Sequence, residues 1–134
     1  MKKIIISVSV LVIIIAIAVF LFLNKSTITP SLTAIDQPIS NNSVTVQRVM
    51  ATESSWLVIQ TETNQVPGPV IGYLKINKGE TKDIKVTIDS AQATTRLFAM
   101  IHEDTGEKGK FDFPGNDMPL LFNGDMVSQL FTIK

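Results

Sequence analysis

The N-terminal part of the chain carries a long apolar run that limits what the protein can fold into. Between Ile4 and Leu23, 18 of the 20 residues are apolar, and only Ser7 and Ser9 interrupt the run. As a helix rising about 1.5 Å per residue, twenty residues span about 30 Å, the thickness of the hydrocarbon core of a bilayer. Because lipid offers no partner for unpaired backbone groups, the run predicts a transmembrane helix over residues 4–23.

The residues that flank this run predict its orientation. Lys2 and Lys3 precede it, so the positive-inside rule places residues 1–3 in the cytoplasm and the rest of the chain outside a single-pass membrane anchor. A cleaved secretory signal is the alternative. Its apolar region usually has about 7–15 residues and precedes a small-x-small cleavage site, and residues 21–25 offer no such site. An uncleaved signal anchor is therefore favoured, and both interpretations place the following domain outside the cell.

Composition excludes several classes of protein. Twelve basic and twelve acidic side chains give a net charge of zero, which argues against a nucleic-acid-binding protein. The chain has no cysteine, which excludes a disulfide scaffold and a thiolate metal site, and no cofactor is predicted. A blue-copper centre needs two histidines and a cysteine, whereas this chain has one histidine. The length suits a single domain after the anchor.

Residues 24–42 are rich in Ser, Thr, Asn and Pro and show no sustained period. Such a composition is typical of a spacer. We therefore predict a flexible linker over 24–42 and an extracellular β-sandwich domain over 43–134.

The domain consists of short runs rich in β-branched and aromatic residues, separated by turn residues. Ile84, Val86 and Ile88 alternate with polar residues, as in a half-solvated strand, and Asn123-Gly124 is a strong hairpin signal. Trp56 begins a run that is apolar on both faces, which indicates a core residue in a central strand. The predicted strands cover 43–50, 56–62, 70–77, 81–89, 94–102, 120–122 and 126–133. The pattern predicts an all-β, seven-stranded antiparallel immunoglobulin-like sandwich, with a small open barrel as the alternative.

The stretch 99–119 concentrates the groups that could carry chemistry. It holds the only histidine and five of the twelve carboxylates. Strand period places His102 and Asp104 on one face at the end of a strand. The candidate ligand-binding residues are His102, Asp104, Glu107, Asp112 and Asp117.

Three interpretations of this stretch compete. Carboxylates and loop carbonyls suit a cation, either Ca²⁺ or a transition metal, although the spacing does not follow the EF-hand pattern. A hydrolase would use His102 or Asp104, but the sequence contains no Gly-x-Ser-x-Gly motif, so no catalytic residue is assigned. The favoured interpretation is structural: Asp and Asn bond the local backbone, and Phe111 and Phe113 hold the loop against the sheet.

Several segments together resemble a known family. They are Val-Thr-Val-x-Arg-Val at 44–49, Trp-Leu-Val-Ile at 56–59, Pro-Gly-Pro-Val-Ile-Gly-Tyr at 67–73, Lys-Gly-Glu at 78–80, the block 97–119 and Ser-x-x-Phe-Thr-Ile at 128–133. This combination resembles the domain of unknown function 7282, which is frequent in exported proteins of haloarchaea and some bacteria. The resemblance implies a β-sandwich on cell-surface proteins and supplies no activity. This chain differs by its single copy, its anchor and its neutral charge.

Together these features predict a membrane-anchored cell-surface module. It is expected to be non-enzymatic and to serve in binding, adhesion or envelope structure. Its expected partners are the lipid bilayer through residues 4–23 and an envelope protein or glycan. Cation binding through the 102–117 loop, or hydrolysis by His102 and Asp104, is the alternative.

Overall fold

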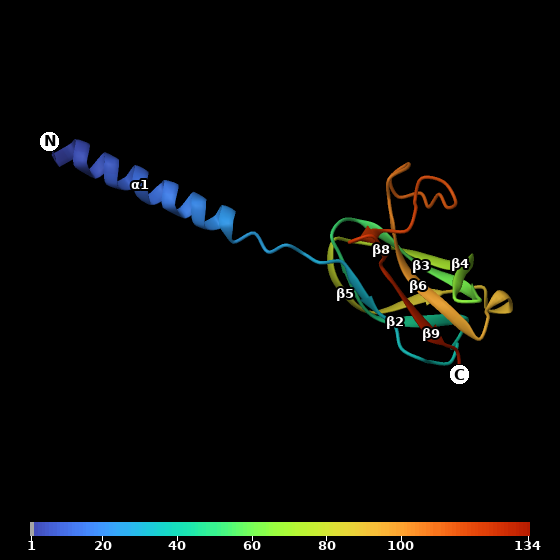
Figure 1. Cartoon of the computed structure of the whole chain (residues 1–134). Helices are drawn as coiled ribbons and strands as arrows, with labels where there is room; N and C mark the ends of the chain where they lie inside the picture. The colour runs from blue at the N-terminus through green and yellow to red at the C-terminus, as the bar shows by residue number, and fades with distance from the viewer. Residues whose placement is uncertain (1) are drawn as a thin grey trace.

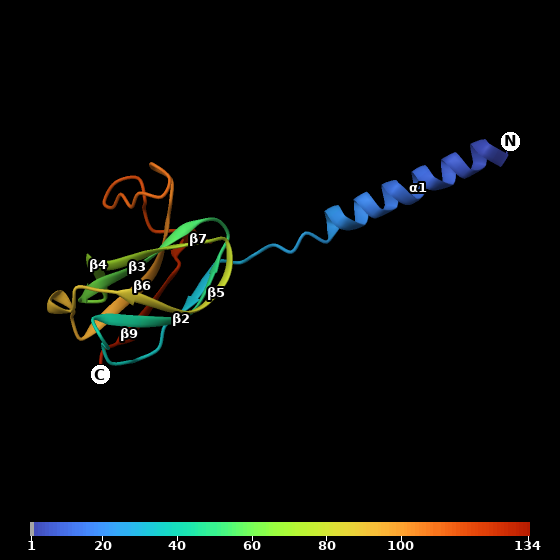
Figure 2. The same cartoon turned by 180° about the vertical axis from the view of Figure 1, so that it is seen from behind.

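The computed structural model describes residues 2–134, with side chains from residue 8 onward. Helix α1 spans Lys2–Leu23 and stands apart from the rest of the protein, joined to it by an extended segment (Figures 1 and 2). Its large apolar side chains from Val8 to Leu23 are 49–75% exposed.

The transmembrane prediction finds no support here. Within the described part of the chain, no helix is both long enough and apolar enough to count as a membrane span. The predicted cytoplasmic residues 1–3 lie outside the residues whose side chains are described.

The rest of the chain forms antiparallel sheets. The strands are β1 (Ser31–Thr33), β2 (Ser43–Ala51), β3 (Ser55–Thr63), β4 (Val66–Ile76), β5 (Gly79–Thr87), β6 (Arg96–Glu103), β7 (Leu121–Phe122), β8 (Asp125–Met126) and β9 (Ser128–Thr132). One sheet has the order β1-β2-β5, the second β4-β3-β6-β9, and β7 pairs only with β8. A short 3-10 helix, Ser90–Gln92, precedes β6.

The described residues thus contain nine strands where the sequence predicts seven. The predicted strand 126–133 is divided at Val127 into β8 and β9. The N–H of Val127 donates to the Leu120 carbonyl, and the carbonyl of Val127 accepts from the Ile101 N–H. The hairpin at Asn123-Gly124 is confirmed, and both residues have the positive φ angles that a tight hairpin turn requires.

The predicted linker over 24–42 is wrong for its second half. Strand β1 pairs with β2, with Ser31 opposite Met50. Further along, the Gln37 side chain hydrogen-bonds the backbone of β2 as a neighbouring strand would. Its Oε1 accepts from Thr45 N–H at 2.7 Å and its Nε2 donates to Thr45 O at 2.8 Å. Asp36 accepts from Thr132 N–H at 2.9 Å. A three-residue strand and polar side-chain contacts give no hydrophobic period, so the β domain begins near Pro30 rather than at residue 43.

One hydrophobic core draws side chains from both larger sheets. Val44 and Val46 of β2 join Leu57 and Ile59 of β3 and Phe131 of β9 in a single buried cluster. The edges of the two sheets also meet closely: a Cβ built on Gly72 would lie 2.4 Å from the Thr87 carbonyl oxygen.

Strand register places several connections at one end of the domain. Ser55 lies opposite both Ile76 and Glu103, and Ala51 lies opposite Gly79. The segment that comes from α1 reaches this same end, whereas the C-terminus lies at the opposite end (Figure 1). We call it the tethered end. It carries the turns 52–54 and 77–78 and the loop 104–118.

The second sheet is buried on both faces at its centre. Trp56, Val58, Met100 and His102 are all buried, although none belongs to the main core cluster. They lie on the opposite face of β3 and β6, where the loop 104–118 contacts Trp56 and His102. This is the physical reason why β3, an interior strand as predicted, contains the unbroken apolar run 56–59.

Candidate functional site

The candidate site begins with a row of three side chains across the second sheet. Trp56 lies opposite Lys75 on β4 and opposite His102 on β6. Residues directly opposite one another in antiparallel strands project from the same face. The Lys75 ammonium stands 4.6 Å from the centre of the Trp56 ring, within cation–π range. Trp56 is buried, as predicted, but under the loop rather than in the main core.

His102 is completely buried, with an exposed fraction of 0%. Its Nδ1 lies 2.8 Å from the Asp117 carbonyl oxygen, which can only accept, so Nδ1 carries the proton and donates. Nε2 is also buried and has no hydrogen-bond partner among the described residues. The ring centres of Phe113 and Phe111 lie 4.7 and 6.0 Å away. Burial in these surroundings lowers the pKa of His102 and favours the neutral ring.

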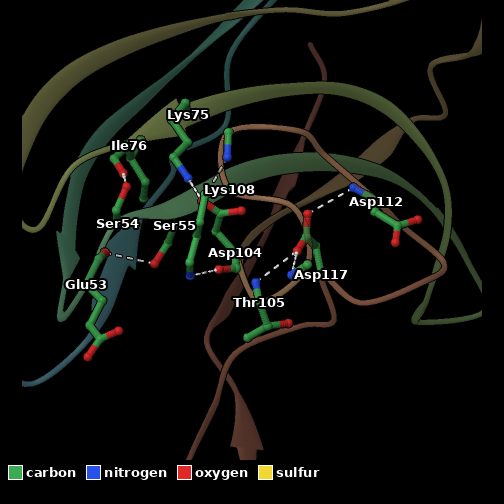
Figure 3. A network of polar contacts seen from close by, with 12 residues as sticks. Glu53, Ser54, Ser55, Lys75, Ile76, Asp104, Thr105, Lys108, Asp112 and Asp117 are labelled. Atoms are coloured by element: carbon green, nitrogen blue, oxygen red, sulfur yellow. Dashed lines mark hydrogen bonds and ion pairs between the residues drawn. The ribbon is translucent and has the colours of Figure 1, made fainter.

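Asp104 comes two residues later, and its side chain is only 2% exposed. Its carboxylate forms an ion pair with Lys75 (Figure 3). The same ammonium lies over the Trp56 ring. Gly109 N–H donates to the same carboxylate at 3.3 Å, and Lys108 donates to the Asp104 backbone carbonyl. The hydrogen bond from Lys75 lowers the pKa of Asp104 and favours its ionised carboxylate.

Asp117 organises the backbone of the loop. It is fully buried. Its Oδ1 accepts from the N–H groups of Thr105 and Gly106 at 3.0 and 3.2 Å, and its Oδ2 accepts from Asp112 N–H at 2.9 Å (Figure 3). With the His102 bond to its own carbonyl, Asp117 joins the start, the middle and the end of the loop to the sheet.

The two remaining predicted residues lie nearer the surface. Asp112 accepts from the backbone and side-chain N–H groups of Asn116 at 3.2 and 2.9 Å. Its carboxylate also fills the space where a side chain on Gly115 would stand. Glu107 is exposed, and its carboxylate lies 3.6 Å from the Lys110 ammonium.

Four of the five candidate residues therefore lie in the loop and His102 lies on β6, and the five do not converge on one point. Among the described residues, no group of three or more His, Cys, Asp or Glu side chains is arranged to hold a metal ion. Their local backbone bonds are those that the structural interpretation of the sequence expects. A ligand-binding role for them stays a prediction.

A polar depression of about 310 Å³ lies beside the loop at the tethered end. Ser54, Glu103 and Lys108 are among its lining residues. The sequence did not indicate that the turn 52–54 would line this depression. It also did not indicate Lys75 as a site residue, because Lys75 and Asp104 are 29 residues apart in the chain. The one available signal was the position of Lys75 in an otherwise apolar strand.

The fold and the site describe a small antiparallel β domain whose polar loop is tied to one sheet. The chain belongs to the family described as domain of unknown function (DUF7282), which matches residues 30–134. The match begins one residue before β1 and thirteen residues before the predicted boundary at residue 43.

Two relatives come from Haloarcula hispanica. Cell surface glycoprotein 1 is 28% identical over 102 residues, and cell surface glycoprotein 2 is 26% identical over the same length. Each alignment covers 75% of this chain and 11% of the relative, so the chain spans about a tenth of the proteins it matches. No solved structure matches the chain.

Proposed function

We propose that this protein is a non-enzymatic module of the cell surface, with a structural or adhesive role toward envelope proteins or glycans. The observation that carries the proposal is the use of its polar groups. His102, Asp104 and Asp117 are buried, and each bonds the loop or its neighbours. The names of the two relatives, both cell surface glycoproteins, support the location.

The same observation argues against hydrolysis. A general acid or base must come within hydrogen-bond reach of a substrate. The Nδ1 of His102 is occupied by Asp117, and its Nε2 is enclosed by protein. Asp104 is paired with Lys75. Neither His102 nor Asp104 can therefore reach a substrate while the loop covers them.

We also propose that the fold is an immunoglobulin-like sandwich. The two larger sheets contain seven strands, in the orders β1-β2-β5 and β4-β3-β6-β9. In chain order this corresponds to strands A, B and E facing strands C′, C, F and G, which is an arrangement of that architecture. The single core shared by both sheets supports it.

For the location we propose that residues 4–23 enter a lipid bilayer. The support is the apolar run in the sequence and the exposure of the apolar side chains of α1 from Val8 onward. Large exposed apolar surfaces are unfavourable in water. Full-length protein should float with vesicles through a density gradient and resist alkaline extraction. Recovery of the protein in the soluble fraction would contradict the proposed membrane anchor.

The structural role of the loop is tested by replacing Asp117 with Ala. Three partly buried backbone N–H groups would lose their acceptor, so the free energy of unfolding should fall by about 3 kcal/mol. Urea unfolding measures this. Glu107→Ala is the matched control, because its exposed carboxylate should contribute within about 0.5 kcal/mol.

Calorimetric titration with calcium, zinc and copper separates the structural interpretation from cation binding. The proposal expects no saturable heat with the unmodified protein. Tight binding that is lost in both His102→Ala and Asp104→Ala would overturn it in favour of a cation-binding module.

A further inference from the structure

The hairpin formed by β7 and β8 exposes an unusual amount of apolar surface. Leu121, Phe122 and Met126 are 61%, 39% and 43% exposed. Leu121 and Met126 lie opposite one another in the hairpin, whereas Phe122 lies opposite Asp125. Because successive residues of a strand project to opposite faces, the hairpin exposes apolar side chains on both of its faces.

Exposure on both faces indicates the kind of partner. A flat protein surface would cover one face of a projecting hairpin and leave the other in water. A medium that surrounds the hairpin covers both. An apolar tip of this shape is suited to the boundary between lipid headgroups and acyl chains.

The position of the hairpin points to the same partner. A depression of about 360 Å³ is lined by Pro30 and Leu32, which begin the domain, and by Phe122 and Met126 of the hairpin. The hairpin therefore stands beside the point where the chain arrives from α1, and both views of the molecule show this (Figures 1 and 2).

The connection to α1 is short. Seven residues, 24–30, separate the end of the helix from β1. Fully extended, they span at most about 25 Å. If α1 lies in a bilayer, the tethered end of the domain must remain close to that bilayer, with the hairpin on the side that faces it.

We propose that the hairpin 120–127 inserts its apolar tip into the surface of the bilayer that holds α1. This rests on the membrane anchor proposed above. It makes the domain lie against the membrane by two attachments, the helix and the hairpin. The domain then has a fixed orientation, with its C-terminal end directed away from the membrane.

Asp125 limits the depth of insertion. A carboxylate is costly in the hydrocarbon core, and Asp125 lies at the turn opposite Phe122. The hairpin therefore enters only the interfacial region, about 5–10 Å deep. Asp125→Asn should increase the depth.

The absence of cysteine allows a direct test. Full-length Leu121→Cys carries an environment-sensitive fluorophore and is reconstituted in phosphatidylcholine vesicles containing nitroxide-labelled lipid. Val66→Cys is the matched control, because Val66 is also 61% exposed but sits by the turn after β3, at the opposite end of the domain. We expect a blue-shifted emission at position 121, with quenching at least about twofold greater than at position 66.

A second variant tests the apolar tip itself. With the fluorophore at Met126→Cys, the changes Leu121→Asp and Phe122→Asp should return its emission to that of a water-exposed group. Both side chains are exposed, so the domain should stay folded, which circular dichroism verifies.

The outcomes separate the hairpin from the anchor. A chain that fails to float with vesicles overturns both proposals. A chain that floats while position 121 remains as water-exposed as position 66 overturns the hairpin insertion alone. A blue shift without nitroxide quenching means that protein, such as a second copy of the chain, covers the hairpin, and this also overturns it.

Discussion

His102 and Asp117 use their polar groups for hydrogen bonds within the domain. Their bond joins the end of β6 to the end of the loop, and the Asp117 carboxylate closes the loop from inside. His102 is a titratable group held without exposure to water. The stability of the domain should therefore depend on the charge state of this ring.

The pH dependence of stability follows from the lowered pKa of His102. The unfolded chain binds a proton at about pH 6.5, whereas the folded chain resists it until lower pH. The free energy of unfolding should be fully present above about pH 6.5 and should decrease as the pH falls below it. Urea unfolding between pH 7 and pH 5.5 measures the slope.

The chain has one histidine, so the slope can be attributed. His102→Gln cannot titrate in this range, and its stability should be lower but nearly independent of pH. An unchanged slope in this variant would contradict the assignment.

At the scale of elements, the close approach of β4 and β5 joins the two sheets. Asp89 N–H donates to the Ile71 carbonyl at 2.7 Å, and Gly72 lies against the backbone at the end of β5. The contact allows no side chain at this position. Gly68, four residues earlier in the same strand, approaches only the side chain of Thr61 closely.

We expect Gly72→Ala to lower the free energy of unfolding by about 1–3 kcal/mol, since its Cβ would clash with the Thr87 carbonyl and with Ile88. Gly68→Ala is the control, because the Thr61 hydroxyl can rotate away. Chemical denaturation of both variants decides. Equal losses of stability would show that the glycines act through strand propensity rather than through the approach of the sheets.

At the scale of the whole molecule, the domain includes residues that the sequence assigns to a linker. Strand β1, the Gln37 side chain and the bond from Thr132 to Asp36 attach residues 31–42 to both sheets. The β domain is thus a unit of residues 30–134, and α1 is joined to it by the six residues 24–29.

Fragments test this boundary. Residues 30–134 should unfold cooperatively, and a fragment that begins at Asn24 should be equally stable. A fragment that begins at Ser43 loses the β1 pairing and several hydrogen bonds, so its free energy of unfolding should be lower by about 3 kcal/mol or more. Thermal and urea unfolding followed by circular dichroism compare the three. Equal stability of all three would restore residues 31–42 to the linker.

The sequence by itself determined the features that depend on local pattern. The apolar run, the all-β class, the alternating strand that contains Ile84 and the hairpin at Asn123-Gly124 each follow from period or turn chemistry within a few residues. The block 97–119, together with the other segments that resemble the family, also indicated the family. These signals are local because they depend on the backbone conformation that each residue prefers and on which face of one strand or helix is apolar.

Only the tertiary structure decided which distant residues meet. The ion pair of Lys75 with Asp104, the cover of loop 104–118 over Trp56 and the pairing of β1 depend on register between strands that are far apart in the chain. Register is fixed by the packing of whole faces and not by any short segment. For the same reason, the partners of the candidate residues, such as Lys75 for Asp104, could not be predicted from the sequence.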